Sequence, residues 1–287
     1  MEILQLNSML TRFLEEDIGY GDLSANAIFD TQMGTAQLVS RQDGVFAGGQ
    51  LLTVGYKLLN NTISVTLHVK DGEWMTQGTI LAEIKGAVRD ILKGERVLLN
   101  LLQRMSGIAT LTHRAIKMLD DPSIYLCDTR KTTPGLRMLE KYAVRMGGGK
   151  NHRFGLDDGV MVKDNHIAVC GSIRDAVAKA RVYVGHMVKI EVEIETEEQL
   201  EDAIAAGADV IMFDNCTPEQ VMRYNSITPE HIITEASGGI TLDTLPYYRH
   251  TGVNYISLGF ITHSAPALDI GLDMAITHQE ASHHGSA

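Results

Sequence analysis

The pattern of hydrophobic residues changes along the chain, from a region with strand composition to one with helical spacing. This change divides the chain into two parts. Residues 1–34 open with a short helical pattern, and residues 35–86 combine strand composition with Asp-Gly and Gln-Gly turn signals, which predicts a β-rich region. From about Asp90 to Ile108, apolar residues recur every three or four positions, which predicts a long connecting helix with a break near Gly107. We place the domain boundary in this helix.

After this helix, short apolar segments alternate with helical ones. Buried strands that alternate with helices are typical of parallel βα units. Six such units in roughly 150 residues predict an α/β fold with a parallel, TIM-like barrel that is smaller than the standard eight-stranded form. The predicted strands are 124–127, 160–162, 188–194, 210–213, 232–234 and 255–258.

Polar residues follow these strands directly. Barrel enzymes place catalytic groups at the carboxyl ends of their strands, where the loops converge. A polar group after each of several strands therefore predicts one shared site. The groups in question are Asp128-Thr129-Arg130-Lys131, Lys163, Glu193, Asp214, Ser237-Gly238-Gly239 and Gly259.

Composition narrows the class of protein. The chain has 287 residues, of which 44% are hydrophobic and 21% charged, and this excludes disorder for most of it. A net charge of −11 argues against nucleic acid as a partner, because phosphate neutralisation requires a basic face. The sequence shows neither a secretory signal nor a good membrane span, and three scattered cysteines suit a reducing compartment. We therefore expect a cytoplasmic protein that does not bind membranes.

Residues 128–163 are basic although the whole chain is acidic, because they contain eight Lys or Arg and four Asp or Glu. A cationic pocket in an acidic protein indicates a small anionic ligand, and several arginines with a histidine suit a di-acid, because arginine binds planar carboxylates with two hydrogen bonds. Arg137, Lys141 and Arg145 fall at helical spacing, so we expect them on a solvated helix face. The cations expected at the pocket are Arg130, Lys131, Arg153 and Lys163, together with His152.

A phosphate site is expected at Ser237-Gly238-Gly239, with Gly259 after the next strand, because glycines let backbone N–H groups approach phosphate oxygens. Glu193 and Asp214 are acidic positions at the same mouth, where carboxylates hold Mg²⁺ or ribose hydroxyls. The motifs of P-loop NTPases, dinucleotide-binding folds, zincins and nucleophile-elbow hydrolases are absent from the sequence.

The order of these motifs resembles the quinolinate phosphoribosyltransferase family. The block from Asp128 to Arg153 is highly specific for it, and the shorter segments follow in the family's order. The resemblance implies transfer of a phosphoribosyl group from 5-phosphoribosyl 1-pyrophosphate to quinolinate with decarboxylation, which gives nicotinate mononucleotide, pyrophosphate and CO₂ in de novo NAD biosynthesis. It also implies a need for Mg²⁺ and no organic cofactor. The matching segments are 16–22, 99–110, 128–137, 140–144, 147–153, 163–167, 191–193, 214–215, 235–240 and 262–264.

The resemblance further implies domains, assembly and residue roles. It implies an N-terminal open-faced α/β sandwich of residues 1–107, joined by a C-terminal helix of residues 265–287, and a catalytic α/β barrel of residues 108–264. It implies a homodimer with shared active sites, with further assembly left open. Arg104 matches a position donated across that interface. Quinolinate carboxylates are matched by Arg130, His152, Arg153 and Lys163, the pyrophosphate and Mg²⁺ side by Lys131, Glu193 and Asp214, and the 5′-phosphate by Ser237, Gly238 and Gly259.

Within this set, catalysis is assigned to Lys131, Lys163, Glu193 and Asp214, the metal to Glu193 and Asp214, and further substrate contacts to Thr129 and Gly239. Other functions stay open. A phosphoribosyltransferase for a mono-acid such as nicotinate, or a molybdenum-associated relative, would not require the full set Arg104, Arg130, Arg153 and Lys163. A non-catalytic sensor of the di-acid would not need the pyrophosphate and metal groups, and a Schiff-base aldolase at Lys163 would leave the arginines unexplained.

Overall fold

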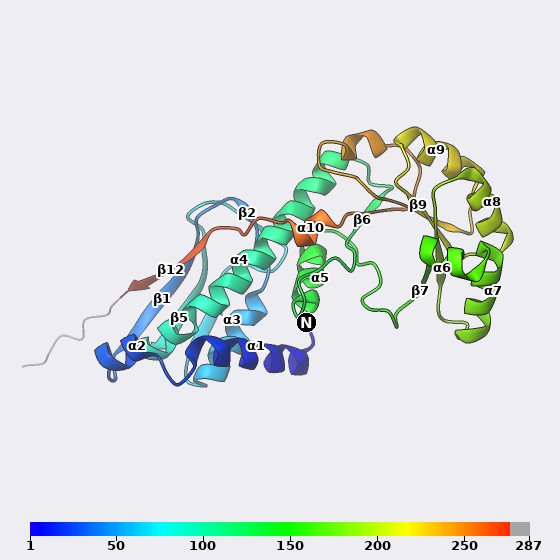
Figure 1. Ribbon diagram of the computed structural model, residues 1–287. Helices are drawn as coiled ribbons and strands as arrows, with labels where there is room; N and C mark the ends of the chain where they lie inside the picture. Colours follow the sequence, from blue (N-terminus) through cyan, green and yellow to red (C-terminus); the bar gives the residue numbers. More distant parts are fainter. Residues whose placement is uncertain (276–287) are drawn as a thin grey trace, which may run out of the picture. The chain divides into compact units, whose positions relative to one another are not determined.

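The computed structural model describes residues 1–275 and divides the chain into two compact units (Figure 1). Unit 1 comprises Met1–Thr110 and the described residues from Pro266 onward, and unit 2 comprises Leu111–Ala265. The long predicted helix is α4 (Val88–Leu119), and it is continuous. A Cβ atom at Gly107 would lie 2.0 Å from the carbonyl oxygen of Pro266, so this glycine permits a close approach by the returning chain instead of breaking the helix.

Unit 1 is built on an antiparallel sheet with the strand order β12-β1-β5-β3. Gly55 of helix α3 (Gly49–Leu59) lies directly against Leu98 of α4. A Cβ atom at Gly55 would lie 2.5 Å from the Leu98 side chain, so the glycine permits this close packing. The sheet strands are β1 (Met33–Ser40), β3 (Ser64–Leu67), β5 (Ile80–Ala87) and β12 (Ile270–Ala275); β2 (Gly44–Val45) pairs with β4 (Trp74–Met75). The other helices are α1 (Ile3–Ile18), α2 (Leu23–Ile28) and α3 (Gly49–Leu59).

Two expectations for unit 1 are corrected. The predicted C-terminal helix is wrong for Ile270–Ala275, which pair antiparallel with β1 from Ser40 to Thr35 as strand β12. That helix was expected from the family resemblance. The free edge of β1 instead supplies backbone partners for this segment, which is a long-range effect. Residues 276–287 of that expectation lie outside the described residues. Helix α3 was hidden within the region predicted to be β-rich.

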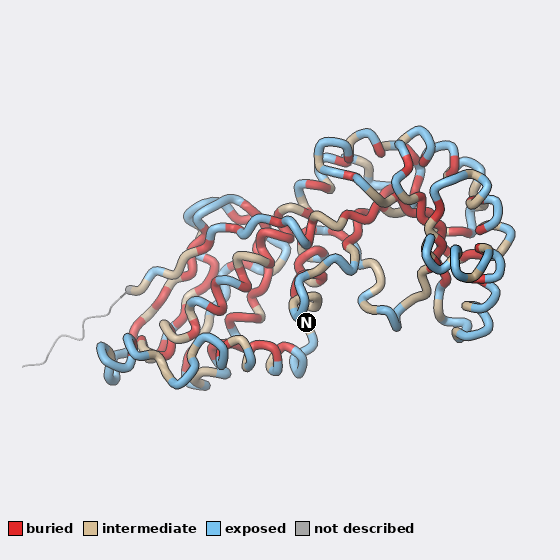
Figure 2. The backbone as a smooth tube through the Cα atoms, viewed as in Figure 1, coloured by how far each residue is buried: buried red, intermediate tan, exposed pale blue. Residues whose placement is uncertain are grey.

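Unit 2 contains the six predicted strands in one parallel sheet, with the order β6-β11-β10-β9-β8-β7. The helices that connect the strands lie on the outer side of the sheet, and buried residues concentrate on the strands (Figures 1 and 2). The strands are β6 (Tyr125–Cys127), β7 (Val160–Val162), β8 (Ile190–Ile194), β9 (Val210–Asp214), β10 (Ile233–Ser237) and β11 (Tyr255–Ser257). The helices are α5 (Arg137–Met146), α6 (Asp164–Cys170), α7 (Ile173–Tyr183), α8 (Glu197–Ala205), α9 (Pro218–Ile227), the 3-10 turn η1 (Leu245–Tyr248) and α10 (Phe260–His263).

The register of this sheet brings the strand ends together. Ser237 at the end of β10 pairs with Asp214 at the end of β9, and Glu193 on β8 pairs with Met212. Strands β6 and β7 stand at the two edges of the described sheet, so the barrel is open between them. The predicted α/β architecture is confirmed. In the described part of the chain, every helix is too short or too polar to cross a membrane.

Candidate active site

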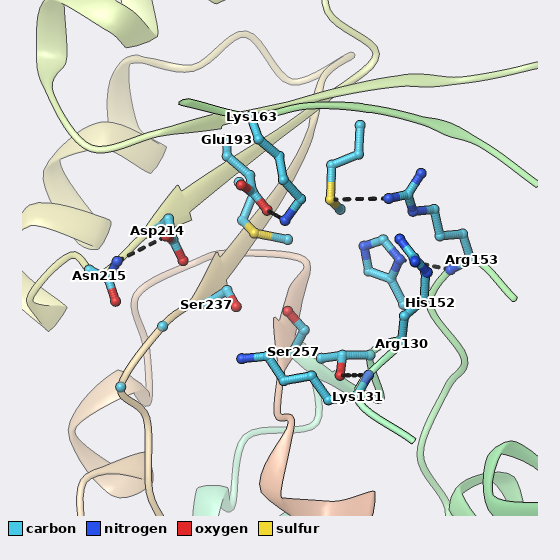
Figure 3. A pocket seen from close by; sticks show the side chains of 15 residues that line it. Arg130, Lys131, His152, Arg153, Lys163, Glu193, Asp214, Asn215, Ser237 and Ser257 are labelled. Carbon is cyan, nitrogen blue, oxygen red and sulfur yellow. Dashed lines mark hydrogen bonds and ion pairs between the residues drawn. The ribbon is translucent and has the colours of Figure 1, made fainter. Parts of the chain in front are cut away.

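A cavity of about 390 Å³ opens at the carboxyl ends of the unit 2 strands. Figure 3 shows side chains from separate strand ends and loops converging around it. Every site residue predicted from the sequence lines it, apart from Arg104, which belongs to unit 1, and Gly259. The lining residues are Thr129, Arg130, Lys131, His152, Arg153, Met161, Lys163, Glu193, Met212, Asp214, Asn215, Ser237, Gly238, Gly239 and Ser257.

The cationic side of the cavity comes from two loops. Arg130 and Lys131 follow β6, and Arg153 lies in the loop that leads to β7. One guanidinium nitrogen of Arg153 donates to the carbonyl of Gly159 at 2.7 Å, which fixes the side chain. Burial and the nearby charge of Arg130 lower the pKa of Arg153. The two guanidinium groups therefore repel one another in the free protein, and an anion between them would relieve that repulsion.

The acidic side lies across the cavity. Nζ of Lys163, directly after β7, lies 2.5 Å from Glu193 of β8. Burial raises the pKa of Glu193 although Lys163 opposes the rise, and burial together with Glu195 raises the pKa of Asp214. Half-buried carboxylates that resist ionisation are stabilised by a cation. Their oxygen atoms are the ligands that Mg²⁺ prefers, so this pair fits the predicted metal.

Different constraints favour glycine at the two positions after β10 and at Gly259, which follows β11. Gly238 has a φ of +85°, and a Cβ atom there would lie 2.3 Å from the side-chain oxygen of Asn215. Gly239 also has a positive φ, +64°, with open space around it. Beyond the next strand, a Cβ atom at Gly259 would lie 3.0 Å from the side chain of Lys131. The turn thus exposes backbone next to the cavity, as a phosphate site requires.

A buried cluster that the sequence did not reveal lies below His152. Nε2 of His152 lies 3.1 Å from Glu191 and 3.7 Å from Glu235, whose carboxylate accepts a hydrogen bond from Ser257. Burial and the charge of Glu191 raise the pKa of Glu235 to about 7. These carboxylates raise the pKa of His152 against the effect of burial, but the N–H of Arg153 donates to Nδ1 and opposes a second proton there. We therefore place the histidine proton on Nε2.

One predicted surface cation is buried. Lys141 is 2% exposed and forms an ion pair with Asp128, so its expected place on a solvated helix face is wrong. Arg145, one turn further along α5, is exposed as predicted, and Arg137 is half-buried and donates to Thr132. Helical spacing alone could not separate these three, because the partner of Lys141 comes from the end of β6.

Comparison with known proteins places this site in a family. The model of the quinolinate phosphoribosyl transferase C-terminal domain matches residues 108–273, and that of the N-terminal domain matches residues 22–106. The chain belongs to the quinolinate phosphoribosyltransferase family. A probable nicotinate-nucleotide pyrophosphorylase (carboxylating) from Bacillus subtilis is 58% identical over 97% of this chain and 96% of the relative. The membership expected from the sequence motifs is confirmed.

Solved structures of this family agree with the fold. The crystal structure of NadC from Streptococcus pyogenes has a TM-score of 0.93 and 40% identity, and covers 96% of this chain and 100% of that one. The nicotinate-nucleotide pyrophosphorylase from Francisella tularensis has a TM-score of 0.92 and 35% identity, with 96% and 98% covered. Family members thus share both units with this chain.

Four lining residues were given no role in the site from the sequence: Met161, Met212, Ser257 and Asn215, the last of which lay in a matching segment. Ser257 ends β11 and Asn215 follows β9, so the strand-end rule could have found these two, whereas Met161 and Met212 lie in the middle of β7 and β9. Their uncharged side chains gave no further signal. Glu191 and Glu235 were hidden for a different reason, since only the folded sheet brings β8 and β10 around His152.

Proposed function

We propose that the chain transfers the phosphoribosyl group of 5-phosphoribosyl 1-pyrophosphate to the ring nitrogen of quinolinate, with loss of the 2-carboxylate as CO₂. One observation carries this proposal: four cations from three separate loops and two half-buried carboxylates line one cavity. Those cations are Arg130, Lys131, Arg153 and Lys163. Family membership supports the same reaction. The product is nicotinate mononucleotide, for use in NAD biosynthesis.

Quinolinate is assigned to the cationic side. Arg130, Arg153 and Lys163 neutralise its two carboxylates, and His152 offers its ring edge beside them. The phosphoribosyl group is assigned to the opposite side, with Lys131 on the pyrophosphate and the Ser237-Gly238-Gly239 turn, next to Gly259, on the 5′-phosphate. Thr129 completes the substrate contacts: its hydroxyl accepts the backbone N–H of Lys131 and so orients the start of this loop.

The chemistry requires orientation and charge more than proton transfer. The lone pair of the pyridine nitrogen forms a bond to the anomeric carbon while the bond from that carbon to pyrophosphate breaks. The new positive charge on the ring accepts the electron pair of the carbon–carboxylate bond, CO₂ departs, and the ring carbon takes a proton from water. Lys131 stabilises the leaving pyrophosphate, and Lys163 steers the carboxylate that is lost.

Glu193 and Asp214 would hold Mg²⁺, which would neutralise charge on the departing pyrophosphate. Half-buried oxygen ligands with raised pKa values support this assignment. Lys163 already pairs with Glu193, so substrate binding has to draw the Lys163 amine toward the quinolinate carboxylate as the metal arrives. The activity is thus proposed to need Mg²⁺ and no organic cofactor.

Arg104 is proposed to complete the site of a second copy of the chain, in a homodimer. It lies on α4 in unit 1, and the cavity of unit 2 is lined without it. Mixing two inactive variants, Arg104→Ala and Lys163→Ala, tests this. Shared sites would restore activity in mixed dimers, up to about a quarter of the wild-type level, whereas sites contained within one chain would leave the mixture inactive.

The central experiment supplies quinolinate, 5-phosphoribosyl 1-pyrophosphate and Mg²⁺ to the purified chain and follows CO₂ and the mononucleotide together. Equal molar yields of both products are expected. Turnover of nicotinate with no turnover of quinolinate would favour a mono-acid phosphoribosyltransferase instead. Binding of quinolinate with no product of either kind would indicate a sensor and would contradict the proposed reaction.

A further inference from the structure

A buried ion pair lies behind the loop that carries His152 and Arg153. Asp128, the first residue after β6, is fully buried, and Lys141 on α5 is 2% exposed. The two side chains bond directly to each other. Removing two charges from water is expensive, and apolar pairs of similar volume often serve a fold equally well. A buried pair next to a cavity therefore calls for a reason beyond stability.

The hydrogen bonds of this pair supply that reason, because they converge on the backbone of His152. The carboxylate of Asp128 accepts the N–H of His152 at 2.9 Å, and Nζ of Lys141 donates to its carbonyl oxygen at 3.0 Å. Both polar backbone groups of His152 are thus fixed by one ion pair. A loop outside regular secondary structure otherwise leaves such groups to water.

Asn151 adds a third connection to the same pair. Its side-chain amide donates to the second carboxylate oxygen of Asp128 at 2.5 Å and to the backbone carbonyl of Lys141 at 2.8 Å. On the other side, Arg153 is fixed by its bonds to Gly159 and to the ring of His152. The loop is therefore anchored on both sides of the two groups that face the cavity.

We propose that Asp128 and Lys141 are positioning residues that set the spacing of His152 and Arg153 and thereby the affinity for the di-acid. They act through the loop backbone, since neither lines the cavity. The inference rests on the proposed function, because it assumes that quinolinate occupies the cationic side. Most of the 5-phosphoribosyl 1-pyrophosphate side lies on other strands. Lys131 follows β6 as Asp128 does, but its backbone is held by Thr129 and Thr262, so we expect this side to depend much less on the pair.

The test is a comparison of KM values for the two substrates. In Lys141→Met, the KM for quinolinate should rise by about tenfold or more, because small misplacements of binding groups cost large factors in rate. The KM for 5-phosphoribosyl 1-pyrophosphate should stay within about twofold of wild type. A purely structural role would instead lower the active fraction and leave both KM values unchanged.

Two further variants keep the test decisive if the single variant fails to fold. Asp128→Asn/Lys141→Met removes both charges and avoids an unpaired buried carboxylate, yet it still loses the Lys141 bond to His152. Asn151→Ala removes only the exposed member of the network. The double variant should retain the raised KM for quinolinate, and Asn151→Ala should show a smaller rise in the same substrate alone.

The matched control is Arg145→Met, which removes a positive charge from the exposed face of the same helix. It should leave both KM values unchanged. Folded variants at Asp128, Lys141 and Asn151 with a wild-type KM for quinolinate would overturn the inference. Absence of quinolinate turnover in the wild-type chain would instead contradict the proposed function, so the two failures are distinguishable.

Discussion

The two ends of the parallel sheet in unit 2 carry different kinds of surface on the same six strands. The carboxyl ends line the cavity of about 390 Å³, and the amino ends line a second one of about 450 Å³. The second cavity is lined by residues at the starts of five strands or directly before them: Val160, Lys189, Val210, Ile233 and Tyr255. Only His152 and Arg153 line both. The larger cavity is not the proposed site, so volume does not mark function here.

The difference lies in how charges are matched. At the amino ends, charges are met locally: Arg181 lies 2.7 Å from Asp209, and Lys150 lies over the ring of Tyr125. At the carboxyl ends, burial and the charge of Arg130 lower the pKa of Arg153, and burial raises the pKa of Glu193 with a further contribution from Asp214. Repulsion between cations sets the carboxyl ends apart, because Arg130 lines only the first cavity, whereas the repulsion between Glu191 and Glu235 at the second cavity is met by the ring of His152.

The largest expected effect comes from a comparison of two variants, each of which removes one cation from a different end of the sheet. Arg130→Met should raise the KM for quinolinate by about a hundredfold, since truncation of one partner of a desolvated charge pair costs about 2–5 kcal/mol. Lys189→Met, at the amino ends, should leave this KM within about twofold. Steady-state kinetics of both variants check this. Similar rises in the KM for quinolinate in both variants would contradict the assignment of quinolinate to the carboxyl ends.

A second prediction concerns Glu235, which lies between the ends. Its pKa is raised from 4.5 to about 7 in the folded chain, so between these values the folded state keeps a proton that the unfolded state releases. The free energy of unfolding should therefore fall as pH rises through this window, by on the order of 3 kcal/mol. Glu235→Gln should flatten that dependence in urea unfolding measured from pH 4.5 to 8.

The control for this prediction is Glu230→Gln, on the exposed loop before β10. It should leave the pH dependence of unfolding as in wild type. The outcome that contradicts the prediction is a slope that persists unchanged in Glu235→Gln. The buried carboxylates would then not be the groups that hold the extra proton.

The same contrast explains what the sequence could and could not predict. Strand ends are visible in sequence, so the polar groups after β6, β7, β9 and β10 were found together with the fold class. Groups whose role depends on a distant partner were misjudged. Lys141 was placed on a solvated face but pairs with Asp128, and Glu235 was given no role but lies close to His152. The C-terminal helix was expected from the family resemblance, and it is wrong for Ile270–Ala275 because the edge of β1 takes this segment into the sheet.

A third and smaller effect concerns the metal. Asp214→Asn should raise the Mg²⁺ concentration for half-maximal activity by about tenfold, because one anionic oxygen ligand is lost. Burial raises the pKa of Asp214, so the wild-type requirement for Mg²⁺ should also increase as pH falls and the carboxylate takes up a proton. Asp158→Asn at the other cavity keeps an oxygen for the N–H of Phe154 and should leave the Mg²⁺ dependence unchanged. Equal Mg²⁺ curves for the Asp214 variant and wild type would exclude it as a ligand.

The smallest effect is expected at the amino ends themselves. Arg181 and Asp209 form an ion pair whose side chains are 41% and 35% exposed, and such pairs contribute about 0.2–1 kcal/mol. Arg181→Ala should therefore lower the free energy of unfolding by about 0.5 kcal/mol and leave both KM values unchanged. Asp209 keeps its bond to the N–H of Ile190, which holds the start of β8 in place. A change in the KM for quinolinate in Arg181→Ala would mean that charges at the amino ends act on the cavity at the carboxyl ends. It would contradict the conclusion that only the carboxyl ends bind the substrate.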